Sequence, residues 1–140
     1  MSNTSRRRTA VTAVTAVLTL AAAATSLAAL APAQAQAPTL LPSRISVHTT
    51  DTTPASGEQF VLSGAVWSQH LRVPATVRVK TFRDGTWRQL PGAVHETNRD
   101  NRYHLRITLQ MPGERQLKVV GDPRDPTIAT AVTVFSVTVH

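Results

Sequence analysis

Short stretches in which apolar and polar residues alternate run through the chain from residue 44 to residue 139. Because successive side chains of a strand point to opposite faces, this period-two pattern predicts half-buried β-strands. The clearest example is segment 102–109, in which every second residue is apolar or aromatic and the residues between them are polar. No segment of this region has helical periodicity. The predicted strands are 44–50, 59–66, 75–82, 86–90, a weak 93–97, 102–109, 115–120 and 130–139.

Turn-forming residues separate these strands. Asp84-Gly85 lies between two strand patterns and is the strongest hairpin indication, because both positions of such a turn adopt positive φ. Pro91-Gly92 is expected to stop the strand before it, and the proline-containing loop 121–126 cannot lie inside a sheet. In the last strand the apolar residues change phase near Val134 and Phe135, which predicts a bulge.

Together these elements predict an all-β fold, an immunoglobulin-like two-sheet antiparallel β-sandwich of seven to eight strands. Tyr103 is the first inward residue of segment 102–109, and we expect its hydroxyl to bond to nearby backbone. The fold depends on alternation that brings six side chains together between the sheets. They are Val77, Val79, Leu105, Ile107, Leu117 and Val119.

The first 35 residues have the pattern of a secretory signal peptide. Three arginines at 6–8 precede an apolar, alanine-rich stretch at 11–31, and Ala33-Gln34-Ala35 follows it. Cleavage is expected after Ala35, with Ala33 as a second position, and an uncleaved membrane anchor is the alternative. We therefore predict a secreted, extracellular protein with a signal peptide at 1–35, a disordered lead-in at 36–43 and one domain at 44–140.

Three short motifs carry a resemblance to a known family. They are Asp84-Gly-Thr-Trp87, the pattern Tyr103-x-Leu-x-Ile107, and the pattern Pro112-Gly-x-Arg-x-Leu-Lys-Val119. Together they resemble the bacterial Ig-like domains of secreted actinobacterial proteins, and they are similar to fibronectin type III modules. The resemblance implies a sandwich that binds, spaces or presents other molecules.

Residues that would indicate catalysis or a cofactor are scarce. The chain has no cysteine, which excludes disulfides and thiol chemistry, and it lacks a Gly-x-Ser-x-Gly motif. Asp122 and Asp125 are too few for a calcium loop and are read as Asp-Pro turns. His48 and His104 fall on outward positions and could be neighbours across a sheet, but solvated surface histidines are the favoured reading. We predict no enzymatic activity, no cofactor and no metal site.

The charge of the chain indicates what kind of surface it could bind. The whole chain carries +7, and removal of the leader leaves 12 basic and 8 acidic residues. A modest positive charge favours anionic partners, and the dispersed basic residues argue against nucleic acid. Alternation sends Arg78, Lys80 and Lys118 outward as a basic stripe. We take this stripe as a hypothetical contact for an anionic cell-wall or extracellular polymer, with a plain solvated sheet face as the alternative.

The two tryptophans leave a choice open. A two-residue Asp84-Gly85 turn would place Trp87 opposite Phe82 on the outer face, whereas a bulge would turn Trp87 into the core, the placement that large aromatics favour. Trp67 is out of phase with its apolar neighbours, although a bulge at Gly64 could turn it inward, and residues 67–73 would form a loop able to bind a partner. Two exposed tryptophans would instead indicate a carbohydrate-binding module. The candidate partners are thus a cell-wall polymer, a glycan or another secreted protein, with a membrane contacted only through an uncleaved leader.

Overall fold

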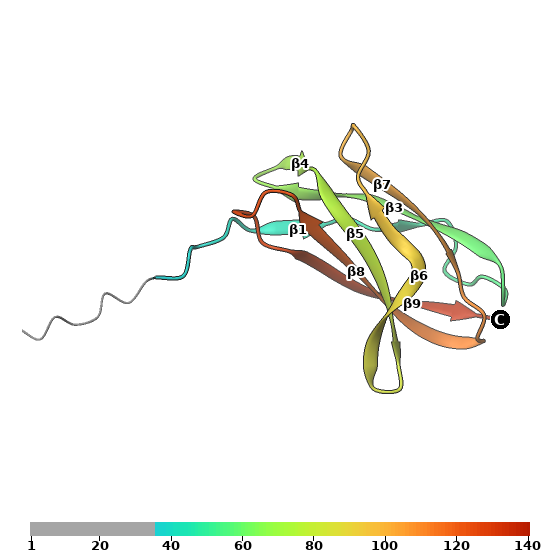
Figure 1. The fold of residues 1–140 in the computed structure, drawn as a ribbon. Helices are drawn as coiled ribbons and strands as arrows, with labels where there is room; N and C mark the ends of the chain where they lie inside the picture. Colours follow the sequence, from blue (N-terminus) through green and yellow to red (C-terminus); the bar gives the residue numbers. More distant parts are fainter. Residues whose placement is uncertain (1–35) are drawn as a thin grey trace, which may run out of the picture. The chain divides into compact units, whose positions relative to one another are not determined.

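The structure, a computed structural model, describes residues 36–140, so the predicted signal peptide and its cleavage position lie outside the described residues. In this region the regular structure consists of β-strands in two antiparallel sheets (Figure 1). The predicted all-β sandwich is confirmed. No helix in this part of the chain is long and apolar enough to cross a membrane. The strands are β1 (Ser43–Ile45), β2 (His48–Thr49), β3 (Gln59–Ser68), β4 (Leu71–Val73), β5 (Ala75–Arg83), β6 (Thr86–Glu96), β7 (Arg102–Thr108), β8 (Gly113–Pro123) and β9 (Ala131–Val139).

The first sheet is built around β3. Strands β1 and β2 lie along one edge of β3, while β4 and β7 follow one another along its other edge. Ile45 of β1 pairs with Val66, and His48 of β2 pairs with Ser63 in the same register. β1 and β2 are therefore one edge strand with a short interruption.

The second sheet has the strand order β6-β5-β8-β9, so β5 lies between its hairpin partner and β8, as the immunoglobulin-like order predicts. The β5–β6 hairpin turns on two residues, Asp84 with φ 52° and Gly85 with φ 76°. Arg83 and Thr86 form the closing pair. Positive φ at both turn positions matches the right-handed twist of the flanking strands, which confirms the predicted hairpin.

The core lies between the two sheets, and all six side chains predicted to fill it are buried. Apolar burial of this kind is the main stabilising term for the domain. The two sheets approach each other closely at Gly121 of β8. A methyl group built at this position would lie 2.5 Å from Cγ2 of Val66 and 3.0 Å from Cδ1 of Ile45, on the opposite sheet. Glycine at this position lets the two sheets meet.

Three expected strand features are wrong. Residues 121–123, expected in a loop outside the sheets, are the last residues of β8 and pair with β5, with Pro123 at the end of the strand. β6 does not stop at Pro91-Gly92 but continues to Glu96, with its register against β5 shifted between Arg78 and Lys80. Proline is tolerated because β6 is an edge strand, where a missing N–H costs no ladder bond. The bulge expected near Val134 is also absent, since β8 and β9 pair in unbroken register.

Both ends of strand β9 are covered at its outer edge. The Leu41 backbone bonds to Thr127 and Ala129 just before β9, so ordered structure begins before the expected boundary at residue 44. Near the other end, the N–H groups of Thr138 and His140 donate to the carbonyl oxygens of Thr52 and Pro54. Segments from the N-terminal third of the domain thus close much of an otherwise open sheet edge.

Candidate binding surfaces

The predicted basic stripe lies on the outer face of the four-stranded sheet. Lys80 of β5 pairs directly with Lys118 of β8, and Arg78 pairs with Val120 one row away. All three cationic side chains are half-buried at most, since their strands alternate strictly against a buried inner row. The structure therefore brings together the three residues that alternation placed on one face.

Trp87 lies on the same outer face, packed between an aromatic ring and a cation. Its ring centroid is 5.1 Å from that of Phe82 at a tilt of 57°, and Lys118 Nζ lies 4.0 Å from the Trp87 centroid. Phe82 is 40% exposed, and Trp87 is half-buried. The favoured core placement of Trp87 is wrong, because the two-residue turn keeps Phe82 and Trp87 in register and facing outward.

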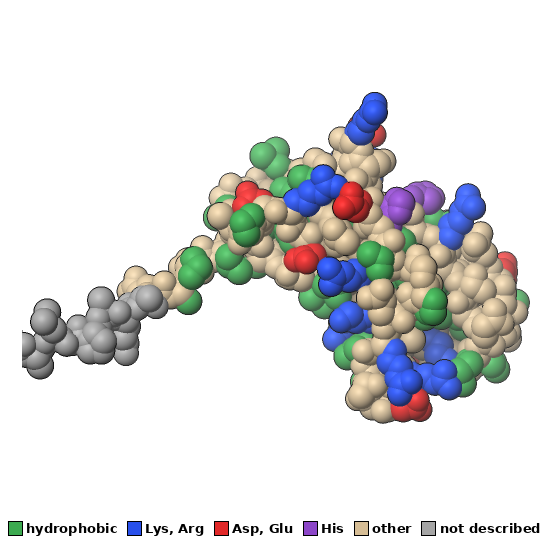
Figure 2. Space-filling model, viewed as in Figure 1, with side chains coloured by type: hydrophobic (Ala, Val, Ile, Leu, Met, Phe, Trp, Pro, Cys, Tyr) green, Lys and Arg blue, Asp and Glu red, His purple; other side chains and the backbone are tan. Residues whose placement is uncertain are grey.

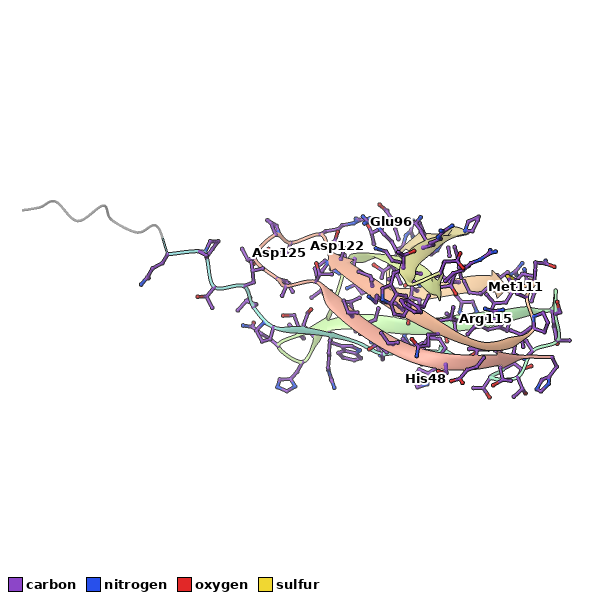
Figure 3. The ribbon with its side chains drawn as sticks, turned by 90° about the horizontal axis from the view of Figure 1, so that it is seen from below. His48, Glu96, Met111, Arg115, Asp122 and Asp125 are labelled. Carbon is purple, nitrogen blue, oxygen red and sulfur yellow. The ribbon has the colours of Figure 1, made fainter. Side chains whose placement is uncertain are left out.

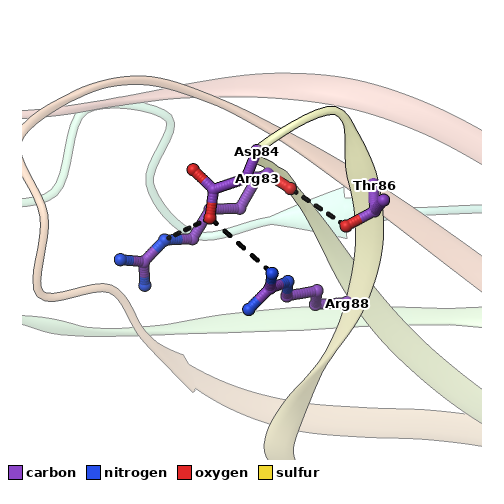
Figure 4. A network of polar contacts seen from close by, with 4 residues as sticks. All are labelled: Arg83, Asp84, Thr86 and Arg88. Carbon is purple, nitrogen blue, oxygen red and sulfur yellow. Dashed lines mark hydrogen bonds and ion pairs between the residues drawn. The ribbon is translucent and has the colours of Figure 1, made fainter.

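At the hairpin tip beside this cluster, ion pairs partly neutralise the arginine side chains (Figure 4). One Asp84 carboxylate oxygen lies 3.5 Å from Nε of Arg83 and 3.8 Å from an Nη of Arg88. The Thr86 hydroxyl donates to the Arg83 carbonyl oxygen over 3.1 Å. In the space-filling view, basic side chains lie beside an acidic one at the tip of this hairpin (Figure 2). Exposed pairs of this kind add little stability, but they reduce the positive charge at the tip.

Further along the face, Arg78 pairs with Asp122 at 3.8 Å. Within residues 36–140, Lys80 and Lys118 have no carboxylate at ion-pair distance. Val132 and Val134 of β9 border the Lys118 row and are 54% and 49% exposed. The outer face thus combines two unneutralised ammonium groups, an aromatic pair and an apolar border.

Trp67 lies on the other sheet, on its outer face. Strict alternation holds through β3, so the bulge considered at Gly64 is absent and Trp67 points outward. Arg44 of β1 and Arg72 of β4 pair with Trp67 from either side, and their guanidinium carbons lie 5.4 Å and 5.1 Å from its ring centroid. The expected loop 67–73 is instead a tight hairpin. Its turn residues, Gln69 and His70, both have positive φ.

A hollow of about 400 Å³ lies next to Trp67 on this sheet face. Ser63 and Ala65, two small outward residues of the middle strand, line it. His48 and His104 pair with Ser63 from opposite sides, so β3 separates the two histidines that were considered possible neighbours. Sequence reasoning missed this hollow. The only indication was the pair of small outward residues, and the pattern does not reveal which side chains flank them.

Neither histidines nor carboxylates form a metal centre among the described residues, in which no group of three His, Cys, Asp or Glu is placed to hold an ion. Asp125 accepts hydrogen bonds from the Thr127 hydroxyl and backbone N–H, and these bonds lower the pKa of its carboxyl group. Asp122 accepts one from Thr130. Both aspartates lie toward the end of the sandwich where residues 36–42 enter (Figure 3). Asp125 thus stabilises a turn, as the Asp-Pro reading predicts, whereas Asp122 belongs to strand β8 and also pairs with Arg78.

Comparisons with known proteins give structural likenesses only. No family model and no curated protein matches the chain. A β-glucosidase from Listeria innocua aligns at 14% identity and a TM-score of 0.46, over 69% of this chain but only 16% of the enzyme. A CARDB domain from Pyrococcus furiosus in complex with di-metal ions aligns at 14% and 0.39, over 71% of this chain and 87% of that domain. The sporulation control protein Spo0M from Bacillus subtilis aligns at 10% and 0.41, over 70% of this chain and 49% of Spo0M. The enzymatic activity and the metal ions are properties of those proteins.

Proposed function

We propose that residues 36–140 form a secreted, non-catalytic binding module. Its ligand is an anionic cell-wall or extracellular polymer, which it contacts through the outer face of the four-stranded sheet. The observation that carries the proposal is the position of Lys118, whose ammonium group lies over the Trp87 ring and beside Lys80. A cation held on an aromatic face stays in place at an exposed position and presents its donors to a ligand.

The shape of this face suits an extended ligand rather than a small one. The stripe runs across neighbouring strands, and the aromatic pair and the exposed valines continue it on either side. A polymer bearing repeated negative charges would contact both lysines together, and summed contacts of this kind bind more tightly than one. Catalysis is not part of the proposal, and among the described residues no group of three His, Cys, Asp or Glu is placed to hold a metal ion.

A carbohydrate-binding module is the second candidate, because both tryptophans lie on outer faces. The cations that cover their rings count against it: Lys118 lies over Trp87, and two arginines lie over Trp67. A neutral sugar would need those ring faces free. The tryptophans also lie on opposite sheets, so they cannot form one stacking platform.

Co-sedimentation with purified bacterial cell walls tests the proposal, with walls stripped of their anionic polymers as the comparison. The triple substitution Arg78→Ala, Lys80→Ala and Lys118→Ala should weaken binding at least about tenfold, since each of the three contacts contributes on the order of 0.5–1 kcal/mol. Stripped walls should bind the unmodified protein weakly.

The matched control removes the same charge elsewhere, through Arg44→Ala, Arg99→Ala and Arg106→Ala. All three of these arginines are exposed, and they lie outside the stripe. This control should bind walls nearly as well as the unmodified protein. Equal loss in both triple variants would mean that net charge alone drives binding, and the proposed face would be rejected.

A further inference from the structure

We infer that the hollow beside Trp67 is a second binding site, and that it takes a phosphate monoester carried on a small molecule such as a sugar. This site lies on the sheet opposite the basic stripe and does not rest on the function proposed for that stripe. The inference starts from the shape of the hollow. Ser63, Gly64 and Ala65 of β3 line it, between larger side chains of β2, β4 and β7.

The two arginines that line the hollow lack negative partners. Arg72, Arg102, His48 and His104 all line it, and no Asp or Glu does. Neither arginine forms an ion pair within residues 36–140, whereas three of the arginines on or near the β5–β6 hairpin do. Unpaired guanidinium groups around a concave surface attract an anion from solution, and their forked donors match phosphate oxygens.

The backbone around the two arginines is fixed before any ligand arrives. The turn at 98–101 connects β6 to β7 and contacts β4. Within it, Asn101 Nδ2 donates to the Arg72 carbonyl oxygen over 3.1 Å, and Asn98 Oδ1 accepts from the Arg102 N–H over 3.0 Å. The Arg72 guanidinium also lies over the Trp67 ring at 5.1 Å. A site that is already ordered loses less conformational entropy when it binds.

The size and walls of the hollow indicate what carries the anion. A volume of about 400 Å³ exceeds the space needed by an inorganic ion and lies at the lower end of ordinary small-molecule sites, roughly 300–1,000 Å³. Trp67 lines one side of the hollow with Arg72 over its ring, while serine and asparagine side chains supply neutral hydrogen-bonding groups. These features fit a polar ring or chain attached to a phosphate group. A phosphate monoester can use several cations at once through its three terminal oxygens, more than a carboxylate can.

The test is titration of the purified protein with four probes: glucose-6-phosphate, inorganic phosphate, glucuronic acid and glucose. The fluorescence of Trp67, read in a Trp87→Phe background, reports occupancy of the hollow, and calorimetry gives the affinity. We expect glucose-6-phosphate to bind most tightly, inorganic phosphate less so, glucuronic acid weakly, and glucose not at all. Glucuronic acid binding as tightly as glucose-6-phosphate would overturn the assignment to phosphate, as would binding of glucose.

Substitutions then assign the binding to the hollow. Arg72→Gln and Arg102→Gln should each weaken glucose-6-phosphate binding about tenfold, because each removes a charged donor pair. The hydrogen bonds that fix these residues involve backbone atoms, so both substitutions leave them in place. The control Arg78→Gln with Lys118→Gln, on the opposite face, should change affinity less than twofold. Unchanged binding in the hollow variants, or equal loss in the control, would refute the site.

Discussion

The phenolic hydroxyl of Tyr103 donates a hydrogen bond of 2.7 Å to the backbone carbonyl oxygen of Ser46. Tyr103 pairs with Gly64 on the middle strand, and its ring reaches across that strand to the far edge. The bond occurs where β1 and β2 are interrupted, so one side chain ties three strands together. The expected bond to backbone is confirmed, with an acceptor 57 residues away in the chain.

Removal of this hydroxyl should destabilise the domain. Tyr103→Phe keeps the buried ring but leaves the partly buried Ser46 carbonyl without its donor, at a cost of about 1–3 kcal/mol. The free energy of unfolding, from urea titration followed by tryptophan fluorescence, measures the effect. A variant as stable as the unmodified protein would show that water replaces the hydroxyl at no cost.

The same tyrosine predicts how stability depends on alkaline pH. Burial raises the pKa of Tyr103 above its ordinary value, so the unfolded chain ionises first, near pH 10. Its contribution to stability is therefore complete below about pH 10 and is lost as the pH rises further. Because the chain has one tyrosine, tyrosinate absorbance reports on this residue alone. The absorbance should rise together with unfolding, whereas a rise in the folded protein near pH 10 would contradict the prediction.

Gly64 should not tolerate a side chain. A methyl group there would lie 1.9 Å from the Ser46 carbonyl oxygen and 2.9 Å from the Tyr103 hydroxyl oxygen. Gly64→Ala should therefore cost more than about 3 kcal/mol, by strain and by loss of the tyrosine bond. Gly92→Ala is the control: its φ is 71° but its methyl group meets open space, so it should cost only about 1–2 kcal/mol. Thermal unfolding of both variants by circular dichroism gives the comparison.

The close approach at Gly121 predicts coupling between the two sheets. Gly121→Ala overlaps Val66, and Val66→Ala alone leaves a cavity, so each should destabilise the domain by about 1–3 kcal/mol. Combined, the added methyl group fills part of the space that the valine leaves. The double variant should therefore be at least about 0.5 kcal/mol more stable than the sum of the single effects. If denaturant titrations show that the two changes in unfolding free energy simply add, residues 121 and 66 do not interact across the sheet interface.

Alternation was enough to predict the sandwich, its core and the basic stripe, because burial on one face imposes the period directly. It failed where exposed residues are apolar. Val132 and Val134 were read as a change of phase, but they are outward valines on a regular strand. Trp87 was misplaced for a related reason, since a large aromatic on an outer face runs against the usual preference for burial.

The hollow could not be predicted from the same pattern. Its walls come from β2, β4 and β7, and which of their residues stand opposite Ser63 and Ala65 depends on strand register. Register follows from the whole arrangement of turns and pairs, which a single strand pattern does not contain. The positive φ of Gln69 and His70 was also hidden, because neither residue is a common turn former in that role.

Strand β9 lies at the edge of its sheet, where exposed N–H and C=O groups can template the addition of a strand from another molecule. The backbone bonds from Leu41 at one end, and from Thr52 and Pro54 at the other, leave only the middle of β9 open to such pairing. The two covering segments therefore reduce the length of strand edge that could pair with another copy of the chain in a fibril-like arrangement. In a chain without disulfides, local opening of either segment would lengthen the part of the β9 edge that is open to pairing.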